Sequence, residues 1–216
     1  MTLRQLWVKH RIDLYKFQTI KLGSVLYDDL ISSGVDRNLL DEYILNGRGR
    51  KRTGCITPSV SKTSDQLYEL LGMGGSVSGG AALKSLLQKD DVRDYDVFFP
   101  NISSFVKAHL AVYNNPIIDI CLYENKPYEL FDLGICKCAY SLSGFDVSEE
   151  CKSSINTGIS DIELGAIVHP TATLRRIIKY GTSYKIRFPG SKILILATTD
   201  GVDQSIAKEA LGYAAW

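Results

Sequence analysis

The stretch VSGGAALKSLLQKDDVRDYDVFF, Val77 to Phe99, holds the two features that decide the fold. A Gly-Gly pair precedes a segment with leucines on one side, which predicts a short strand, a glycine turn and a helix from about Ala81. The β-rich segment DYDVFF then predicts a strand that ends at a proline. Asp94 and Asp96 occupy alternate positions of that strand, so they face the same side.

Two carboxylates on one face of a strand lie about 7 Å apart at the backbone. They cannot both be buried and ionised unless a positive charge joins them. A divalent metal supplies that charge, and Mg²⁺ takes one or two carboxylates together with waters and substrate phosphates. The alternative is an edge strand that leaves Asp94 and Asp96 in solvent.

The glycine pair adds a second function to the same region. Gly79 and Gly80 lack Cβ atoms, so the main chain can approach a phosphate closely, and Ser78 adds a hydroxyl. The following helix offers unpaired N–H groups at its start. A Gly-Gly pair alone is more often an ordinary turn. One short helix nevertheless joins the glycines to the aspartates, so both can face one triphosphate and its metal.

The composition is that of a globular protein. The chain has 216 residues, 45% hydrophobic and 23% charged, which predicts one domain or a domain with a helical appendage. Charge interrupts the N-terminal MTLRQLWVKHR, and no apolar run approaches the ~20 residues that span a bilayer. We therefore expect a soluble, cytoplasmic protein without membrane contact.

The charge is uneven along the chain. Residues 1–62 carry eleven Lys or Arg against six Asp or Glu, a balance of +5, while the whole chain stands at +1. The loop NGRGRKRTG contributes Arg48, Arg50, Lys51 and Arg52. Such a loop either tracks a nucleic-acid backbone or is a solvated linker.

The order of expected elements is helix, strand, helix, strand, helix, strands, helix. This order predicts an α+β fold with a mixed sheet flanked by helices and an N-terminal helical segment. We divide the chain into a basic helical segment with a linker (1–62), a core (63–181) and a C-terminal extension (182–216). Helices are expected over 3–32, from Asp36 to about Leu45, over 101–113 with Asn101 as a candidate cap, and over 171–181 with Gly181 just past the end. Residues 146–167 are expected to be irregular.

Five cysteines with irregular spacing favour free thiols in a reducing compartment. Cys136 and Cys138 are expected on the same face of one strand, where small thiols pack well. A zinc site is the weaker alternative, because no second Cys/His pair has the usual spacing.

These motifs together resemble a known group. SGGAALKSLL followed by DYDVFF resembles the nucleotidyltransferase fold of the DNA polymerase β superfamily. ELFDLGICKCAY (129–140) and HPTATLRRIIKYG (169–181) are similar to a strand and a helix of phage and viral nucleotidyltransferase-like proteins. The resemblance covers about Gly72 to Gly181. In tRNA CCA-adding enzymes Arg-Asp follows the Gly-Gly pair closely, where this sequence has Leu83 and Lys84.

The resemblance implies a set of site residues. Asp94 and Asp96 would hold Mg²⁺ or Mn²⁺, with Asp132 as the third acid and Asp119 or Asp146 as alternatives for that place. The predicted nucleotide-binding residues come from the glycine turn, its helix and the later helix: Ser78, Gly79, Gly80, Lys84, Arg176 and Lys179. Arg176 and Lys179, three residues apart, can act together on one helix face, or they are surface cations.

The implied activity is a metal-dependent nucleotidyltransferase that uses an NTP such as ATP. It would transfer a nucleoside monophosphate to a hydroxyl, preferably an RNA 3′ end bound through the basic segment that includes Arg48 and Arg52. The alternatives are nucleotidylation of a protein partner, as small antitoxin-type enzymes do, and an inactive scaffold that keeps the fold. A phage-encoded protein of this kind would act in the host cytoplasm.

Overall fold

The computed structural model describes residues 60–89, 92, 94–111, 115, 117–123 and 126–216, with the isolated positions 28, 31, 32, 37 and 38. Apart from those isolated positions, the predicted N-terminal helices lie outside the described residues, as does the basic loop with Arg48, Arg50, Lys51 and Arg52. The described residues fall into two compact units. Unit 1 includes the described residues up to Pro127 and residues 140–144, and unit 2 comprises 128–139 and 145–216.

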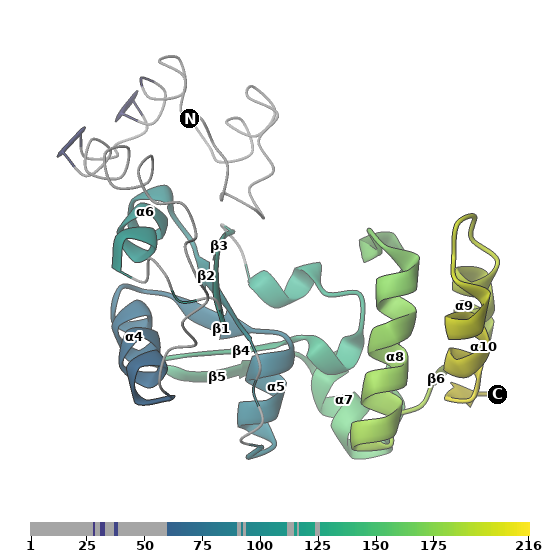
Figure 1. Ribbon diagram of the computed structural model, residues 1–216. Helices are drawn as coiled ribbons and strands as arrows, with labels where there is room; N and C mark the ends of the chain where they lie inside the picture. The colour runs from purple at the N-terminus through teal and green to yellow at the C-terminus, as the bar shows by residue number, and fades with distance from the viewer. Residues whose placement is uncertain are drawn as a thin grey trace. The chain divides into compact units, whose positions relative to one another are not determined.

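Unit 1 contains strands β1, β2 and β3 of a mixed sheet whose strand order is β3-β2-β1-β4-β5 (Figure 1). Strand β1 pairs antiparallel with β2, and β2 pairs parallel with β3. Helix α6 packs on β2 and β3, and α4 packs on α6. The elements of this sheet and its helices are α4 (Val60–Gly72), β1 (Ser76–Ser78), α5 (Gly80–Leu86), β2 (Tyr95–Phe99), α6 (Ile102–Ala111), β3 (Ile118–Leu122), β4 (Cys138–Ser141) and β5 (Gly144–Val147).

The segment from β1 to α6 folds as its sequence predicts. Strand β2 buries Val97, Phe98 and Phe99, which anchor it in the core, while Asp96 stays partly accessible. The Asn101 side chain accepts a hydrogen bond from Ser104 N (2.9 Å) at the start of α6, as expected of a cap. The mixed α+β fold is thus confirmed.

Unit 2 is mostly helical. Helix α8 packs against α9 and α10, α7 packs against η3, and the short strands β6 and β7 pair in parallel. The fully buried Leu174 and Ile177 of α8 contribute to its core. The further elements are η2 (Pro127–Leu130), η3 (Gly134–Cys136), α7 (Glu149–Thr157), η4 (Leu164–Ala166), α8 (Pro170–Tyr184), β6 (Phe188–Pro189), α9 (Gly190–Ala197), α10 (Gln204–Leu211) and β7 (Ala214–Ala215).

The expectation of irregular structure over 146–167 is wrong in its middle part, where α7 forms. The Ser148 side chain caps α7 by accepting a hydrogen bond from Cys151 N (3.1 Å), and Gly158 ends it with a φ of 70°. Few residues of α7 are apolar, so its sequence lacks a helical hydrophobic pattern. The caps therefore define this helix more clearly than its periodicity does.

Two smaller expectations are also corrected. Helix α8 begins at Pro170 and continues to Tyr184, so Gly181 lies inside it instead of beyond its end. Cys136 belongs to η3 and Cys138 to β4, so the two do not share a strand. The cysteines that the structure describes, Cys121, Cys136, Cys138 and Cys151, are buried free thiols.

The structure also bears on membrane crossing. Within the described part of the chain, no helix is both long enough and apolar enough to span a lipid bilayer.

Candidate active site

The sheet of unit 1 places three predicted or alternative site residues in one row. Ser78 on β1 is the register partner of Asp96 on β2, and Asp96 is the partner of Asp119 on β3. Register partners on adjacent strands lie about 5 Å apart and point to the same face. The hydroxyl and the two carboxylates therefore line one side of three neighbouring strands.

The acids of this row influence one another. Burial, the charge of Asp94 and the charge of Asp119 together raise the pKa of Asp96 to about 6. Asp94 immediately precedes β2 and is exposed, and Asp119 is exposed on β3. Three carboxylates thus lie close together, and burial disfavours the ionised form of one of them, Asp96.

Cys121 lies on the same face of β3 as Asp119, two residues further on. Burial raises the pKa of its thiol, and the charges of Asp96 and Asp119 raise it further. The thiol is therefore neutral at physiological pH and adds no negative charge to the row.

The glycine turn lies directly beside the acidic row, since Ser78 precedes Gly79. Gly79 has φ 71° and ψ −135°, a backbone conformation that residues with a Cβ atom rarely adopt. Helix α5 starts at Gly80 and carries Lys84, whose side chain is buried. The sequence-predicted Ser78, Gly79, Gly80 and Lys84 thus belong to the same unit as Asp94 and Asp96.

Asp132 belongs to unit 2 and has other neighbours. It precedes η3 and is not part of a named strand, unlike the expected strand position. Its Oδ2 atom accepts hydrogen bonds from the Thr173 hydroxyl and from Arg176 Nη2, the latter at 2.5 Å. Its side chain is 6% exposed, against 43% for Arg176. Lys179 lies one turn further along α8 and is exposed.

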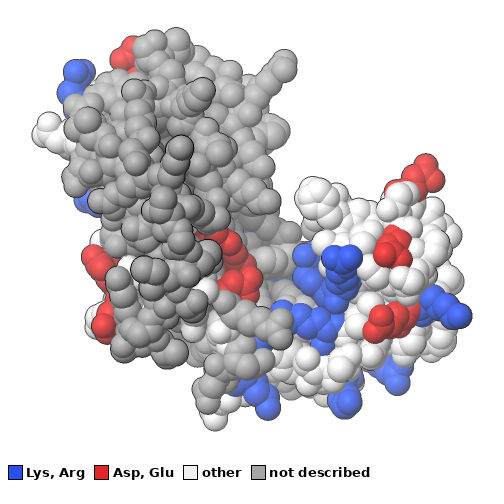
Figure 2. Space-filling view, viewed as in Figure 1, with Lys and Arg blue, Asp and Glu red and all other residues white. Residues whose placement is uncertain are grey.

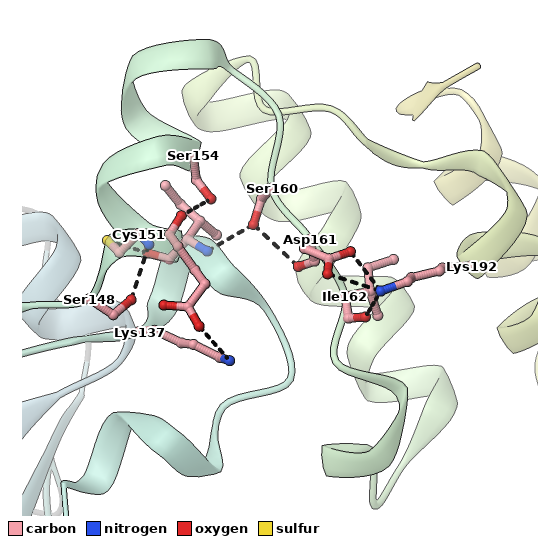
Figure 3. A network of polar contacts seen from close by, with 10 residues as sticks. Lys137, Ser148, Cys151, Ser154, Ser160, Asp161, Ile162 and Lys192 are labelled. Atoms are coloured by element: carbon pink, nitrogen blue, oxygen red, sulfur yellow. Dashed lines mark hydrogen bonds and ion pairs between the residues drawn. The ribbon is translucent and has the colours of Figure 1, made fainter.

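The loop that carries Asp132 is held by a network of polar contacts in unit 2 (Figure 3). Ser160 Oγ accepts a hydrogen bond from Ile135 N (2.8 Å), and Cys151 donates one to the Ile135 carbonyl (3.2 Å). Lys137 reaches Glu150 of α7 at 3.6 Å. These contacts attach η3 to α7 and to residues 159–163, which fixes the backbone near Asp132.

The sequence therefore identified most of the residues that unit 1 gathers, but ranked Asp119 only as an alternative. The signal for Asp119 is a single acid inside the apolar run IIDICL. Asp146, the other alternative, is exposed on β5. The metal and nucleotide roles of all these residues stay predictions.

The fit of a metal follows from the kind of side chains present. Among the described residues, no group of three or more His, Cys, Asp or Glu side chains forms a complete metal-binding cluster. Mg²⁺ does not need one, because it binds through one or two carboxylates, waters and substrate phosphates. The raised pKa of Asp96 indicates a carboxylate that a cation would stabilise, so the donor set fits Mg²⁺ or Mn²⁺.

Comparison with known proteins gives the fold its class. No protein-family model matches the chain. No curated protein matches it either. Solved structures of CCA-adding enzymes do match. The complex with CTP has a TM-score of 0.51 and 14% identity, over 79% of this chain and 48% of that one.

Two further structures of this class match with lower scores. The complex of a CCA-adding enzyme with ATP has a TM-score of 0.49 at 17% identity and covers 82% of this chain and 45% of that one. The Thermotoga maritima CCA-adding enzyme with tRNA has 0.47 at 15% identity, over 85% and 44%. The chain spans about half the length of the structures it matches. Its fold is similar to that of nucleotidyltransferase-type CCA-adding enzymes.

Proposed function

We propose that this protein is a divalent-metal-dependent nucleotidyltransferase that transfers a nucleoside monophosphate from an NTP to a hydroxyl group. The observation that carries the proposal is the row Ser78, Asp96 and Asp119 beside the Gly79 turn, with the pKa of Asp96 raised to about 6. The similarity to the fold of a CCA-adding enzyme solved with CTP supports the same class of reaction.

The acids of unit 1 would hold the metal. Asp94 and Asp96 are the ligands expected from the sequence, and Asp119 is the additional carboxylate that the strand register favours. A divalent cation bound there would supply positive charge to the triphosphate and its leaving pyrophosphate. A cation that neutralised both Asp96 and Asp119 would remove the carboxylate repulsion that, together with burial, raises the pKa of Asp96.

The glycine turn would hold the triphosphate. Gly79 and Gly80 leave the backbone next to Asp96 free of side chains, and Lys84 of α5 brings a positive charge to the same segment. The protein's own contribution to such a reaction is mostly positioning and charge stabilisation, because phosphoryl transfer needs little covalent participation from the enzyme.

An RNA 3′ end is the acceptor we favour. The basic segment with Arg48, Arg50, Lys51 and Arg52 has the charge that a phosphate backbone needs, although it lies outside the described residues. The particular CCA-adding activity of the structural neighbours is not part of the proposal, because Leu83 and Lys84 replace the Arg-Asp expected of those enzymes.

The test is an incorporation assay with labelled NTPs, Mg²⁺ and total RNA. We expect incorporation into RNA that falls at least about a hundredfold in Asp94→Asn and Asp96→Asn, since metal-assisted charge stabilisation supplies several kcal/mol. Asp65→Asn removes an exposed carboxylate from α4 and is the matched control, with unchanged incorporation. Full incorporation by Asp96→Asn would refute the metal assignment. Label that migrates only with a protein would indicate protein nucleotidylation, and no incorporation at all would favour the inactive scaffold.

A further inference from the structure

A second polar cluster, formed by Asp132, Thr173 and Arg176, lies within unit 2. We infer that Asp132 is a positioning residue, which together with Thr173 holds Arg176 so that the rest of its guanidinium binds a phosphate group. This anion site within unit 2 does not depend on the proposed function.

The carboxylate of Asp132 is held in a fixed place. The Asp132 carbonyl accepts a hydrogen bond from Glu163 N (2.7 Å), and the next residue, Leu133, forms an antiparallel bridge with Ile162. Gly134 N donates to the Asp161 carbonyl (3.0 Å). Backbone bonds therefore hold the chain at Asp132 and over the next two residues, and the Asp132 side chain is itself buried.

The three side chains form a closed set of contacts. The Thr173 hydroxyl donates to Asp132 Oδ2 and accepts from Arg176 Nη2 (3.1 Å), while the same Nη2 also donates to Asp132. Thr173 and Arg176 are three residues apart on α8, so the helix sets their separation. A guanidinium tied to two fixed acceptors loses most of its rotational freedom, which lowers the entropy cost of binding a ligand.

A second donor of the Arg176 guanidinium, Nε, is buried and lacks an acceptor among the described residues. A buried polar group without a partner is unfavourable, so an acceptor at this point would stabilise the site. The side chain of Arg176 is 43% exposed, so a ligand can reach it from solvent. Guanidinium groups bind phosphate oxygens through paired N–H donors.

The surrounding charge favours an anion over a neutral ligand. Arg175 and Lys179 are exposed on α8 beside Arg176, and Figure 2 shows Lys and Arg side chains gathered over this helix. Cys136 and Tyr180 are buried and hydrogen-bonded to each other, and burial raises the pKa of both, so they stay neutral. Asp132 balances Arg176, and Asp203 interacts with Arg175, so Lys179 supplies the positive charge that remains for a phosphate.

This role differs from metal ligation, the role predicted for Asp132 from the sequence. Its Oδ2 atom already accepts two hydrogen bonds, one of them from a cation. The two roles predict opposite effects of removing the charge. If Asp132 only contributed negative charge near the ligand, its neutralisation would tighten binding of an anion. If it positions Arg176, neutralisation loosens that binding.

The test measures binding of inorganic tripolyphosphate by calorimetry, without divalent metal, at a fixed temperature below the melting temperature of every variant. We expect Asp132→Asn and Arg176→Lys each to raise Kd about tenfold, and the double variant to raise it no further, because Asp132 acts through Arg176. Thr173→Val should raise Kd several-fold, whereas Thr173→Ser, which keeps the hydroxyl, should bind like the wild type.

The control is Asp200→Asn, which removes one exposed carboxylate from the same unit. It should leave Kd unchanged. Unchanged or tighter binding in Asp132→Asn, equal binding in Thr173→Val and Thr173→Ser, or no binding by the wild type would each overturn the inference. Full incorporation by Asp96→Asn would refute the metal assignment of the proposed function but would not affect tripolyphosphate binding. Loss of the expected tripolyphosphate effects would refute only this inference, so the two failures are distinguishable.

Discussion

The environment of Asp96 disfavours the ionised form of its side chain. It is partly buried on β2 and lies between Asp94 and its register partner Asp119. Burial and repulsion both disfavour its ionised form, which is why its pKa is raised to about 6. This position of Asp96 lowers the stability of the metal-free protein. A bound cation would neutralise the carboxylates and remove their repulsion, as expected for a metal ligand.

The raised pKa of Asp96 predicts how the free energy of unfolding depends on pH. The folded protein binds a proton at Asp96 more tightly than the unfolded chain does, so the stabilising contribution is present at low pH and is lost as pH rises through about 6. In metal-free buffer, Asp96→Asn should therefore be more stable than the wild type at pH 8, by on the order of 1–2 kcal/mol. The difference should diminish towards pH 4.

The measurement is urea unfolding from pH 4 to pH 8 with a chelator present. Asp65→Asn, at an exposed position of α4, should show no such pH-dependent difference from the wild type. A wild type that is more stable than Asp96→Asn at pH 8 would show that Asp96 has a stabilising partner. It would contradict the destabilising effect of burial and of the neighbouring carboxylates on ionised Asp96.

At the scale of elements, α7 shows what a local cap contributes. Ser148 accepts a hydrogen bond from Cys151 N, and α7 packs on the η3 segment that follows Asp132. Ser148→Ala should lower the free energy of unfolding by about 1 kcal/mol, the usual cost of losing a cap. Ser153→Ala, at an exposed position inside α7, should change it by less than about 0.5 kcal/mol. Denaturant unfolding of both variants is the measurement, and equal effects would mean that the cap is not what defines the helix.

The elements also show which parts of the fold the sequence could predict. Strand β1, helix α5, strand β2 and helix α6 were predicted because their signals are local: glycines, leucine spacing, β-branched and aromatic residues, and the Asn101 cap. Helix α7 was missed because it has few apolar residues. The prediction that Cys136 and Cys138 share a strand was wrong because Cys136 ends the 3-10 helix η3, and strand β4 begins only at Cys138.

The candidate site was predictable to the same extent. Asp94 and Asp96 share a local alternating pattern, so their proximity could be read from the sequence. The approach of Asp119 to Asp96 depends on the pairing of β2 with β3, and no local pattern specifies that register. The contact between Asp132 and Arg176 likewise joins residues 44 positions apart.

At the scale of the whole molecule, each unit carries a distinct part of the proposed chemistry. Unit 1 gathers Asp94, Asp96 and Asp119 beside the glycine turn, and unit 2 fixes Arg176 through Asp132 and Thr173. The first set suits a divalent cation and the second suits a phosphate. A divalent cation and a phosphate are the ligands that the proposed nucleotidyl transfer requires.

The most direct measurement is the equilibrium binding of Mn²⁺, followed by electron paramagnetic resonance in the presence of a non-hydrolysable NTP. We expect the wild type to bind Mn²⁺, and Asp96→Asn and Asp119→Asn each to weaken that binding at least about tenfold, because each removes a charged oxygen ligand. Asp65→Asn should bind like the wild type. Identical Mn²⁺ affinity in the wild type and Asp96→Asn would contradict the claim that the carboxylates of β2 and β3 hold the metal.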